Sequence, residues 1–446
     1  MSGRQHRRDF FRTSASAGAG LWIVGSGSDL LARSANEVVN VACVGVGGQG
    51  FGNLRNISGV KIDGKAAVNI VALCDIDDNR LNDAAKLHQK AAKYHDFRKM
   101  LDEKHKEIDA VVVSTPDHTH AVAAIAAMKL KKGVYCEKPM AHSILEARLM
   151  TETAAREKVA SQMGNQGQSG ENTRKIVEIV RSGAIGPVKE MHAWTNRPTW
   201  PQGMETRPET TEIPKHIHWD EWVGPASIRP HSDAYYHFKW RGWWDFGTGA
   251  LGDMACHILN AAFWALDLKY PTSVVAEGEP HSAEGGPRAE TIVYEFPARG
   301  DMPPARVTWY DGGRKPPKDL LPDDVKWSSG GSLLIGEKGK LYIPDDYGGR
   351  HVLLPRDQFK DFKNPAPTLK RSPGHHRDFI EAVKDPSRPA SSDFSYSGPL
   401  TEMVLLGVVA FRANKKLEWD GPNMKVMNSS DADAFIRPTF RNGWSV

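Results

Sequence analysis

Short, continuous apolar runs alternate with amphipathic segments in the first part of the chain, from Glu37 to about residue 160. The apolar runs are rich in Val, Ile and Ala, which is typical of parallel strands buried on both faces. The expected strands are Val38–Val46, Val68–Cys74, Ala110–Ser114 and Gly133–Cys136. The expected helices are Asn79–Ala92, Phe97–Lys104 and His120–Leu130. This pattern predicts an α/β fold with a doubly wound parallel sheet over residues 36–160.

The pattern changes after Gly164, where strands with alternating inward and outward residues replace the continuous runs. These strands are expected at Val188–Thr195, Ser273–Glu279, Ala289–Phe296, Ala305–Tyr310, Gly331–Gly336 and Lys340–Pro344. Helices are expected at Glu171–Ser182, Leu251–Leu266, Gly374–Val383 and Gly398–Asn414. Residues 196–245 form a long irregular tract rich in Pro, Trp, His and Tyr. We expect a second α/β domain, residues 161–446, with a large and mainly antiparallel sheet.

Composition narrows the class of protein. The 446 residues are too many for one ordinary core and indicate two domains. An apolar content of 40% and a charged content of 25% are ordinary for a soluble enzyme and exclude a disordered chain or a multi-span membrane protein. The net charge of +4 is spread along the chain and indicates no nucleic-acid partner. The four cysteines form no disulfide pattern, so we expect them to serve packing.

The N-terminus has a different character from the rest of the chain. A twin arginine, Arg7-Arg8, precedes two phenylalanines, a weakly apolar run from Ala15 to Leu31 and the small-residue segment Ala32-Arg33-Ser34. The run is too short and too rich in glycine to span a bilayer, so residues 1–35 resemble a twin-arginine signal peptide. We therefore expect the twin-arginine export machinery as a partner, a periplasmic or otherwise extracytoplasmic location and no membrane span. A disordered basic tail is the alternative.

A glycine-rich turn follows the first expected strand. Gly45-Val46-Gly47-Gly48-Gln49-Gly50 fits the G-x-G-x-x-G pattern, and a helical segment follows it. In this pattern the first glycine makes the turn, the second lets a pyrophosphate approach the backbone, and the third allows the helix to pack closely. Asp75 ends the next strand, beside Ile76, where a carboxylate accepts hydrogen bonds from ribose hydroxyls and repels a 2′-phosphate. We expect NAD as the cofactor, with NADP disfavoured; an ordinary glycine turn with Asp75 as a helix cap is the alternative.

Two further segments end expected strands of the first domain. After the third strand, Thr115-Pro116 would cross the middle of the cofactor, and His120 would face its nicotinamide end. The alternative is that Asp117 or Thr119 merely caps the helix at His120. No third ligand is spaced with the two histidines of this segment, so we expect no metal site.

Glu137-Lys138-Pro139 follows the fourth strand. A lysine fixed there, with Glu137 as its charge partner, is placed to polarise a hydroxyl or carbonyl at the nicotinamide. An ordinary surface turn is the alternative.

Candidate substrate groups come from the second domain. Asp253 and His257 are four residues apart, so they share one face of a helix, and the imidazole can take a proton while the carboxylate positions a hydroxyl. A structural pair that fills a polar gap is the alternative. Seven of the thirteen tryptophans fall between Trp194 and Trp244, and flat aromatic faces beside cations suit sugar rings. The possible substrate contacts are Arg197, Trp200, Tyr236, Arg241 and Trp243, for which core packing is an equally good explanation.

Together, these motifs resemble the Gfo/Idh/MocA family, which includes glucose–fructose oxidoreductase and inositol dehydrogenase. The marks are the glycine turn, Asp75, Thr115-Pro116, Glu137-Lys138-Pro139, Asn165-Gln166 and Asp253-x-x-x-His257. The resemblance implies a Rossmann domain, an open-sheet C-terminal domain that supports a homo-dimer or homo-tetramer, and Gln166 among the cofactor contacts. It also implies a catalytic trio of Lys138, Asp253 and His257, with His257 as the proton acceptor. Asn260 stands where relatives often carry an acid, so the support of His257 differs here.

We therefore expect an exported, NAD-dependent oxidoreductase that acts on a secondary hydroxyl of a sugar, polyol or glycoside. Because free NAD is scarce outside the cytoplasm, the cofactor would be bound before export and stay bound. Two alternatives remain: a redox-neutral, NAD-using enzyme that cleaves glycosides through a keto-sugar, and a non-catalytic sugar-binding protein. Relatives of the first kind tend to lack the lysine of the Glu-Lys-Pro turn, so Lys138 favours the dehydrogenase.

Overall fold

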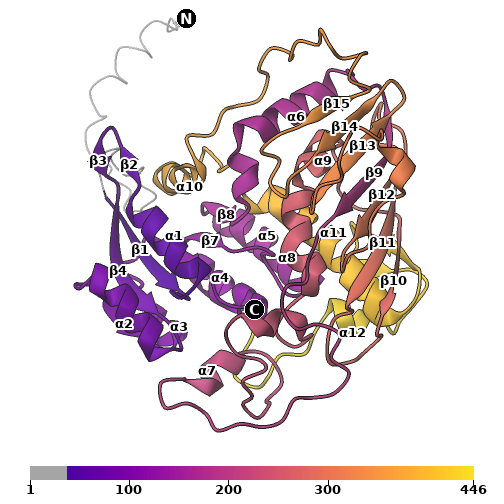
Figure 1. The fold of residues 1–446 in the computed structure, drawn as a ribbon. Helices are drawn as coiled ribbons and strands as arrows, with labels where there is room; N and C mark the ends of the chain where they lie inside the picture. Colours follow the sequence, from indigo (N-terminus) through magenta and orange to yellow (C-terminus); the bar gives the residue numbers. More distant parts are fainter. Residues whose placement is uncertain (1–37) are drawn as a thin grey trace, which may run out of the picture.

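The computed structural model describes residues 38–446, and the twin-arginine segment lies outside these residues. The described part of the chain forms two sheets that lie next to each other with helices between them and around them (Figure 1). The N-terminal sheet is coloured indigo to purple, and the larger C-terminal sheet is mostly orange. The predicted combination of a parallel sheet and a second, mainly antiparallel sheet is confirmed.

The first sheet has the strand order β5-β4-β1-β6-β7-β8, and all its pairs are parallel. Its strands are β1 (Val39–Val44), β4 (Val68–Cys74), β5 (Ala92–Tyr94), β6 (Ala110–Val113), β7 (Gly133–Cys136) and β8 (Ser161–Met163). Its helices are α1 (Gln49–Ser58), α2 (Asp78–Leu87), α3 (Phe97–Lys104), α4 (His120–Lys129) and α5 (Ile144–Glu157). A small hairpin, β2 (Lys61–Ile62) and β3 (Lys65–Ala66), extends from the sheet. The chain order within the sheet is that of a Rossmann fold, whose carboxyl strand ends form a ligand crevice.

The observed elements of this domain depart from the prediction at one helix end and by additional elements that include one helix, apart from shifts of one or two residues. The helix expected to reach Ala92 ends at Leu87, because Ala92 begins the edge strand β5. Helix α5 was not predicted, although Ser143 and Glu146 form a capping box at its start, in which each side chain accepts from the backbone N–H of the other residue.

The second sheet has the order β15-β14-β13-β9-β12-β11-β10-β16-β17, and its pairs are antiparallel except for β9 with β12. Its strands are β9 (Val188–Trp194), β10 (Ser273–Glu279), β11 (Ala289–Phe296), β12 (Ala305–Tyr310), β13 (Gly331–Gly336), β14 (Lys340–Ile343), β15 (Val352–Leu354), β16 (Leu417–Asp420) and β17 (Lys425–Val426). The helices are α6 (Glu171–Arg181), α7 (Trp219–Val223), α8 (Gly249–Ile258), α9 (Asn260–Ala265), α10 (His375–Lys384), α11 (Phe394–Ala413) and α12 (Asp433–Ile436). The helix predicted over Leu251–Leu266 is therefore two helices, α8 and α9, joined at Leu259.

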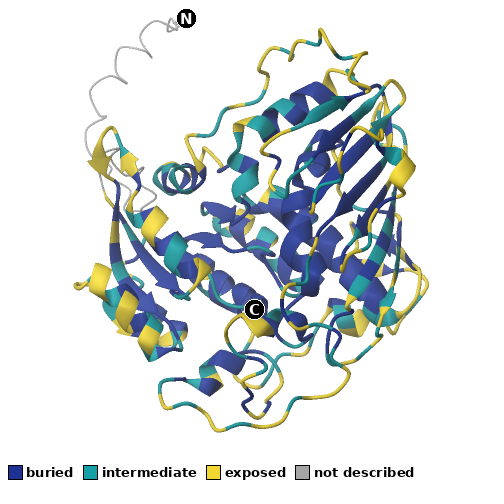
Figure 2. Ribbon diagram, viewed as in Figure 1, coloured by how far each residue is buried: buried dark blue, intermediate teal, exposed yellow. Residues whose placement is uncertain are grey.

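One hydrophobic core joins the two domains. It contains strand residues of the first sheet such as Val113, strand residues of the second such as Val307, and the helices between them. Figure 2 shows these strands and helices buried and the outer loops exposed. Helix α11 packs against α5, α8 and β10. It is long and apolar enough to cross a bilayer, but 83% of its most apolar window is buried inside the protein, as in a core helix.

The irregular tract of residues 196–245 and the C-terminal tail both reach the first domain. Ile217 forms an antiparallel bridge with Asp77, next to β4. Arg441 donates from its backbone to Pro225 of the tract, and Trp444 lies against Phe97 with ring centroids 5.9 Å apart. These contacts lay parts of the second domain over one end of the parallel sheet.

All four cysteines are free and buried, so their predicted role in packing is confirmed. Burial raises the pKa of the Cys43 and Cys256 thiols to about 12, which removes them from thiolate chemistry at neutral pH.

Candidate active site

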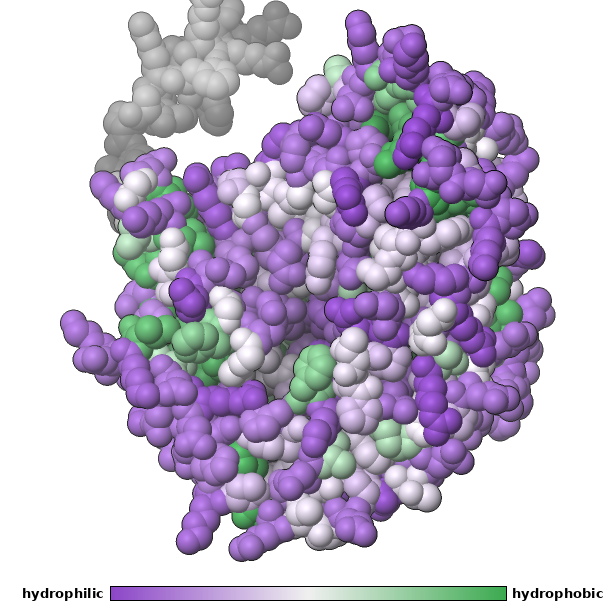
Figure 3. All heavy atoms as spheres, in the orientation of Figure 1, coloured by the Kyte–Doolittle hydropathy of each residue, from purple (hydrophilic) through white to green (hydrophobic). Residues whose placement is uncertain are grey.

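A cavity of about 590 Å³ lies at the carboxyl ends of β1, β4, β6 and β7 and extends to α8. Figure 3 shows the surface hollowed in this central region, with mostly hydrophilic residues around the hollow. The glycine turn, the Glu-Lys-Pro turn and the face of α8 that bears Asp253 and His257 all contribute to its wall. The structure therefore brings the three predicted catalytic residues into the same cavity as the predicted cofactor motif.

The glycine turn between β1 and α1 has the form that a pyrophosphate site needs. Gly45 and Gly48 have positive φ values of 79° and 53°, which disfavour other residues. A Cβ at Gly50 would lie 2.0 Å from the carbonyl oxygen of Gly45, so the third glycine permits close packing, as predicted. Gly47, Gly48 and the first residue of α1, Gln49, line the cavity. The start of α1 is not capped by a side chain; the Gly50 N–H donates to the Gly47 carbonyl, and the helix start at Gln49 faces the cavity, where its positive end favours an anion.

Asp75 lies at the end of β4 and is 9% exposed at the cavity wall, beside Ile76. Its carboxylate accepts from the backbone N–H groups of Val46, at 2.7 Å, and Asp77, at 3.0 Å. Burial raises the pKa of Asp75, and these two hydrogen bonds counter that rise. The carboxylate thus ties the glycine turn to the end of β4, and its remaining lone pairs are placed for ribose hydroxyls.

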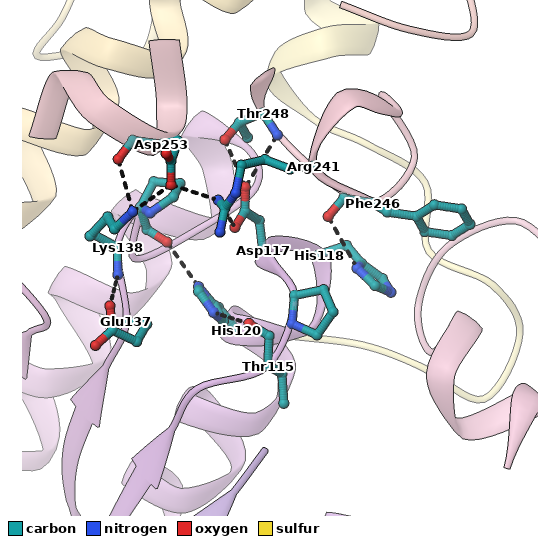
Figure 4. Close-up of polar contacts among 12 residues, drawn as sticks. Thr115, Asp117, His118, His120, Glu137, Lys138, Arg241, Phe246, Thr248 and Asp253 are labelled. Carbon is teal, nitrogen blue, oxygen red and sulfur yellow. Dashed lines mark hydrogen bonds and ion pairs between the residues drawn. The ribbon is translucent and has the colours of Figure 1, made fainter. Parts of the chain in front are cut away.

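The Lys138 ammonium and the Asp253 carboxylate form the central pair of the site (Figure 4). Lys138 Nζ lies 2.5 Å from Asp253 Oδ1 and 2.9 Å from the Asp253 carbonyl oxygen. The two side chains are 14% and 10% exposed, so the pair is largely removed from water. An ammonium has three N–H donors, and the third is left for a substrate oxygen.

Arg241 joins this pair to a second buried carboxylate. Its guanidinium lies 3.3 Å from Asp253 Oδ1 and 3.4 Å from Asp117 Oδ1. Thr248 donates to Asp117 from its hydroxyl at 2.7 Å (Figure 4). Burial opposes the ionisation of Asp253, but Arg241 and Lys138 outweigh it and hold the pKa of this carboxyl below its ordinary value. Asp253 is therefore an anion that fixes two cations in the cavity.

His257 faces the same cavity and is neutral. Burial, and then the charge of Lys138, lower the pKa of His257 to about 3. Its Nδ1 lies 3.2 Å from Asn165 Oδ1, and Asn165 donates in turn to Asn260 Oδ1 at 3.0 Å. An amide oxygen only accepts, so His257 Nδ1 carries the proton and Nε2 is the basic atom. Asn260 thus supports the histidine through Asn165 rather than through a carboxylate.

Glu137 lines the cavity, as expected of a cofactor contact, but it is not the charge partner of the Lys138 ammonium. Its carboxylate accepts from the Asn53 amide at 2.8 Å and from the Lys138 backbone N–H at 3.3 Å. The Gln166 amide approaches it at 3.4 Å. The charge partner of the Lys138 ammonium is Asp253 instead, because the lysine side chain extends across the cavity to α8. Glu137 holds the turn to α1.

The segment after β6 lines the cavity with Thr115, Pro116 and His120. Both ring nitrogens of His120 lie 2.8 Å from carbonyl oxygens, one of Thr115 and one of Pro139, so His120 braces two cavity turns while lining the wall (Figure 4). Helix α4 has no side-chain cap, and Asp117 binds Thr248 and Arg241, so the capping alternative is wrong. Thr115 and Pro116 both line the cavity. The hydroxyl oxygen of Thr115 is buried there and has no hydrogen-bond partner among the described residues. A bound ligand there would satisfy it.

The five predicted substrate contacts separate into three groups. Arg197 and Arg241 line the cavity. Tyr236 also lines it, but its hydroxyl donates to Asp77 at 2.6 Å, which places it at the ribose end. Trp200 and Trp243 lie outside the cavity wall and are 5% and 2% exposed. Their indole N–H groups donate to Gln202 and Ala234, so packing, the alternative explanation, accounts for both tryptophans.

Several residues of the cavity wall were not among the predicted site residues. They include Asp117, Arg80, His95, Phe97, Tyr347 and Trp444. Tyr347 meets the His257 ring edge-on at 4.9 Å, from a loop 90 residues further along the chain. Trp444 comes from the aromatic tail, and no local pattern indicates that this tail crosses to the first domain.

Comparisons with known proteins agree with this architecture. The family model of the Gfo/Idh/MocA oxidoreductases with an NAD-binding Rossmann fold matches residues 39–165. The model of the C-terminal α/β domain of the same family matches residues 169–297, and together the two cover more than half of the chain.

Two curated relatives and one solved structure represent the similarity. A glycosyl hydrolase family 109 protein of Saccharopolyspora erythraea is 29% identical over 208 residues, which is 41% of this chain and 44% of that protein. An inositol 2-dehydrogenase of Salmonella typhimurium is 28% identical over 151 residues, which is 33% of this chain and 43% of that protein. The matched regions thus span less than half of either relative. The WlbA dehydrogenase of Bordetella pertussis, solved with NADH and UDP-GlcNAcA, superposes with a TM-score of 0.60 at 17% identity and covers 86% of this chain and 99% of its own.

The fold, the glycine turn and the two family matches lead to one conclusion. The chain belongs to the Gfo/Idh/MocA family of oxidoreductases and has NAD as the cofactor of its Rossmann domain.

Proposed function

We propose that this protein transfers a hydride between a secondary hydroxyl of a sugar, polyol or glycoside and a tightly bound NAD. The observation that carries the proposal is the 2.5 Å pair of Lys138 and Asp253, in one cavity with a neutral His257 and the glycine turn. The cavity holds a cation to polarise an oxygen and a base to take its proton, which are the two groups that oxidation of an alcohol requires.

The residues of the cavity fit the dinucleotide. Gly45, Gly47, Gly48 and the start of α1 would bind its pyrophosphate, and Asp75 would bind a ribose. The buried, unpartnered Thr115 hydroxyl offers a hydrogen bond along its path. When bound, NAD supplies the acceptor for the hydride.

Four side chains would bind the substrate and move its proton. His257 accepts the hydroxyl proton at Nε2, since Asn165 fixes the proton of its other nitrogen. The Lys138 ammonium stabilises the negative charge that develops on the substrate oxygen, while Asp253 holds that ammonium in place. Arg241 joins Asp253 to the buried Asp117 and would bind a neighbouring hydroxyl.

A redox-neutral cleavage of glycosides is the second candidate. Proteins named glycosyl hydrolase family 109 are among the relatives, at 29–31% identity. Such cleavage begins with the same oxidation and so uses the same base, followed by elimination of the aglycone. The ammonium of Lys138 favours the dehydrogenase, and a sugar-binding protein without turnover would have no use for a neutral His257 beside an ion pair.

A substrate panel separates the three activities. The purified protein, with its bound dinucleotide, is incubated with free sugars, polyols and aryl glycosides, and products are measured by mass spectrometry. Formation of a keto-sugar with reduction of the bound dinucleotide supports the proposal. Release of the aglycone without net NADH would support glycoside cleavage, and binding without conversion would refute both catalytic functions.

We also propose export with the cofactor already bound, supported by the twin arginine Arg7-Arg8 and the apolar run after it. The twin-arginine route carries folded proteins, so a bound dinucleotide can travel with the protein. A second substrate would then reoxidise the NADH in place, as in sugar–sugar transhydrogenation. Fractionation of cells expressing the wild type or the double variant R7K/R8K tests this: equal extracytoplasmic amounts of both would refute it.

One face of the larger sheet supports a further proposal, a homo-dimer or homo-tetramer. Residues of the internal strand β11 alternate between buried and partly exposed, so the outward face of this strand is accessible. Size-exclusion chromatography with light scattering gives the mass directly, and a particle of 49.2 kDa would refute oligomerisation.

A further inference from the structure

Asp78, His95 and His218 form a cluster at the edge of the cavity, away from the catalytic groups. Asp78 is the first residue of α2, His95 follows β5, and His218 directly precedes α7 in the irregular tract. Asp78 Oδ1 lies 3.5 Å from His95 Nε2 and 3.4 Å from His218 Nε2. One potential ligand atom from each residue lies within 4.8 Å of the others. Two imidazoles and a carboxylate therefore converge from three separate segments.

The backbone fixes this convergence. Asp78 donates from its N–H to the His216 carbonyl at 3.0 Å, and His218 donates to the Ile76 carbonyl at 2.9 Å. Asp77 and Ile217 form the antiparallel bridge between these two bonds. The side chains of Asp78 and His218 are thus presented from a short piece of two-stranded ladder, which positions ligands more accurately than free loops do.

One nitrogen of the cluster has a lone pair free for a ligand, and a second nitrogen has no hydrogen-bond partner among the described residues. His95 Nδ1 lies 3.2 Å from the carbonyl oxygen of Asp75, which only accepts, so Nδ1 carries the proton and Nε2 is basic. A carbonyl that orients a histidine in this way is the usual outer partner of a metal-bound imidazole. His218 Nε2 is buried and has no hydrogen-bond partner among the described residues, although Asp78 is near it. A buried nitrogen without a hydrogen-bond partner, beside a carboxylate and a second basic nitrogen, is a combination that a bound cation would satisfy.

The spacing suits a small divalent ion. Zinc bonds of about 2.0–2.2 Å to nitrogen and oxygen place tetrahedral ligands roughly 3.4 Å apart, close to both distances from Asp78. The imidazole rings of His95 and His218 are stacked, with centroids 3.6 Å apart and planes 18° apart. Because the nitrogen lone pairs of stacked rings are nearly parallel, the rings must rotate for both to bind the same ion. Side-chain exposures of 34–39% leave room for that rotation and for water as the fourth ligand.

We propose that Asp78, His95 and His218 bind one divalent transition-metal ion of the zinc class. The ion fastens the irregular tract to the nucleotide domain, beside the carboxylate that reads the ribose. It takes no part in hydride transfer, because the ligands approach the cavity from the Asp75 end, whereas Lys138 and His257 come from the β7 turn and α8. This inference depends only on Asp78, His95 and His218, so it can be correct or wrong independently of the proposed activity.

Zinc binding by tag-free, full-chain protein tests the proposal. After dialysis against EDTA, zinc is titrated in competition with a chromophoric chelator, and bound metal is counted by mass spectrometry. We expect one equivalent in the wild type and at least a tenfold weaker affinity in His95→Gln, in His218→Gln and in Asp78→Asn. His105→Gln, which removes the histidine directly after α3 and outside the cluster, should bind zinc as the wild type does. Cobalt should give the visible bands of a tetrahedral site only where zinc binds.

Circular dichroism of each variant establishes that it is folded. Zinc affinity in the wild type no greater than in the double variant H95Q/H218Q would overturn the proposal. Equal loss in the His105→Gln control would also overturn it, because the metal would then bind by general affinity for histidine.

Discussion

Neutralising the Lys138–Asp253 pair one partner at a time should reveal a strong energetic coupling. The side chains are 14% and 10% exposed and 2.5 Å apart, so loss of one partner leaves a buried charge without its counter-ion. Removal of one member of such a pair costs about 3–5 kcal/mol of unfolding free energy. Lys138→Met should lower the free energy of unfolding by about 2–3 kcal/mol, at or below the lower end of this range, because Arg241 still lies 3.3 Å from Asp253. Asp253→Asn should cost about 3 kcal/mol, since only a carbonyl oxygen then faces the ammonium.

The double variant K138M/D253N should be less destabilised than the sum of the single variants, by about 2 kcal/mol. Urea unfolding of the four proteins, at one saturating NAD concentration, measures this coupling. The exposed pair Lys86–Asp83, 2.7 Å apart with exposures of 75% and 64%, is the matched control and should couple by about 0.5 kcal/mol or less. Turnover should fall by about 10²–10⁴-fold in all three active-site variants alike. Additive stabilities, or activity recovered in the double variant, would refute a shared buried charge pair.

The remaining predictions concern the base and the cofactor. His257→Ala should lower kcat by about 10²–10⁴-fold while the protein keeps its dinucleotide, measured by absorbance after denaturation; an unchanged rate removes His257 from the mechanism. Because the pKa of His257 is lowered to about 3, the base is deprotonated above that value, so kcat/KM should not fall between pH 8 and 5; a loss near pH 6.5 in the pH–rate profile would contradict this. Asn165→Ala should lower kcat by about tenfold, because His257 loses the acceptor that holds its Nδ1 proton and orients the ring; an unchanged kcat would make Asn165 purely structural. Asp75→Ala should reduce the preference for NAD over NADP in kcat/KM, and an unchanged ratio would show that another residue reads the ribose.

The sequence predicts the regular elements well where hydrophobic periodicity is strong. Val68–Cys74 and Ala289–Phe296 match the observed strands because a continuous apolar run and a strict alternation each permit one interpretation. The segment Ser161–Met163 is a strand although its sequence has no such pattern. Its strand conformation results from pairing with β7 and from complete burial. Tertiary context also divides the expected helix at Leu259.

The site is predictable to the extent that each group belongs to a local motif. The glycine turn, Lys138 and the Asp253–His257 spacing carry their own signals, and the structure brings them together. Partners across the cavity carry none: Arg241 and Asp117 are 124 residues apart, and the charge partner of Lys138 is on another domain. Trp243 shows the opposite error, because an aromatic residue in a polar tract has the same sequence signature whether it binds a sugar or fills a core.

The hydrophobic core that passes from one sheet into the other opposes a hinge motion between the two domains of residues 38–446. In a two-domain enzyme with a small interface, the domains can rotate apart and release a nucleotide. In this protein such a rotation would expose the shared apolar core to water. We expect exchange of the dinucleotide to require movement of the tract around Ile217 and of the tail at Trp444. A coenzyme held in this way would outlast many substrate molecules, in keeping with the proposed tightly bound NAD.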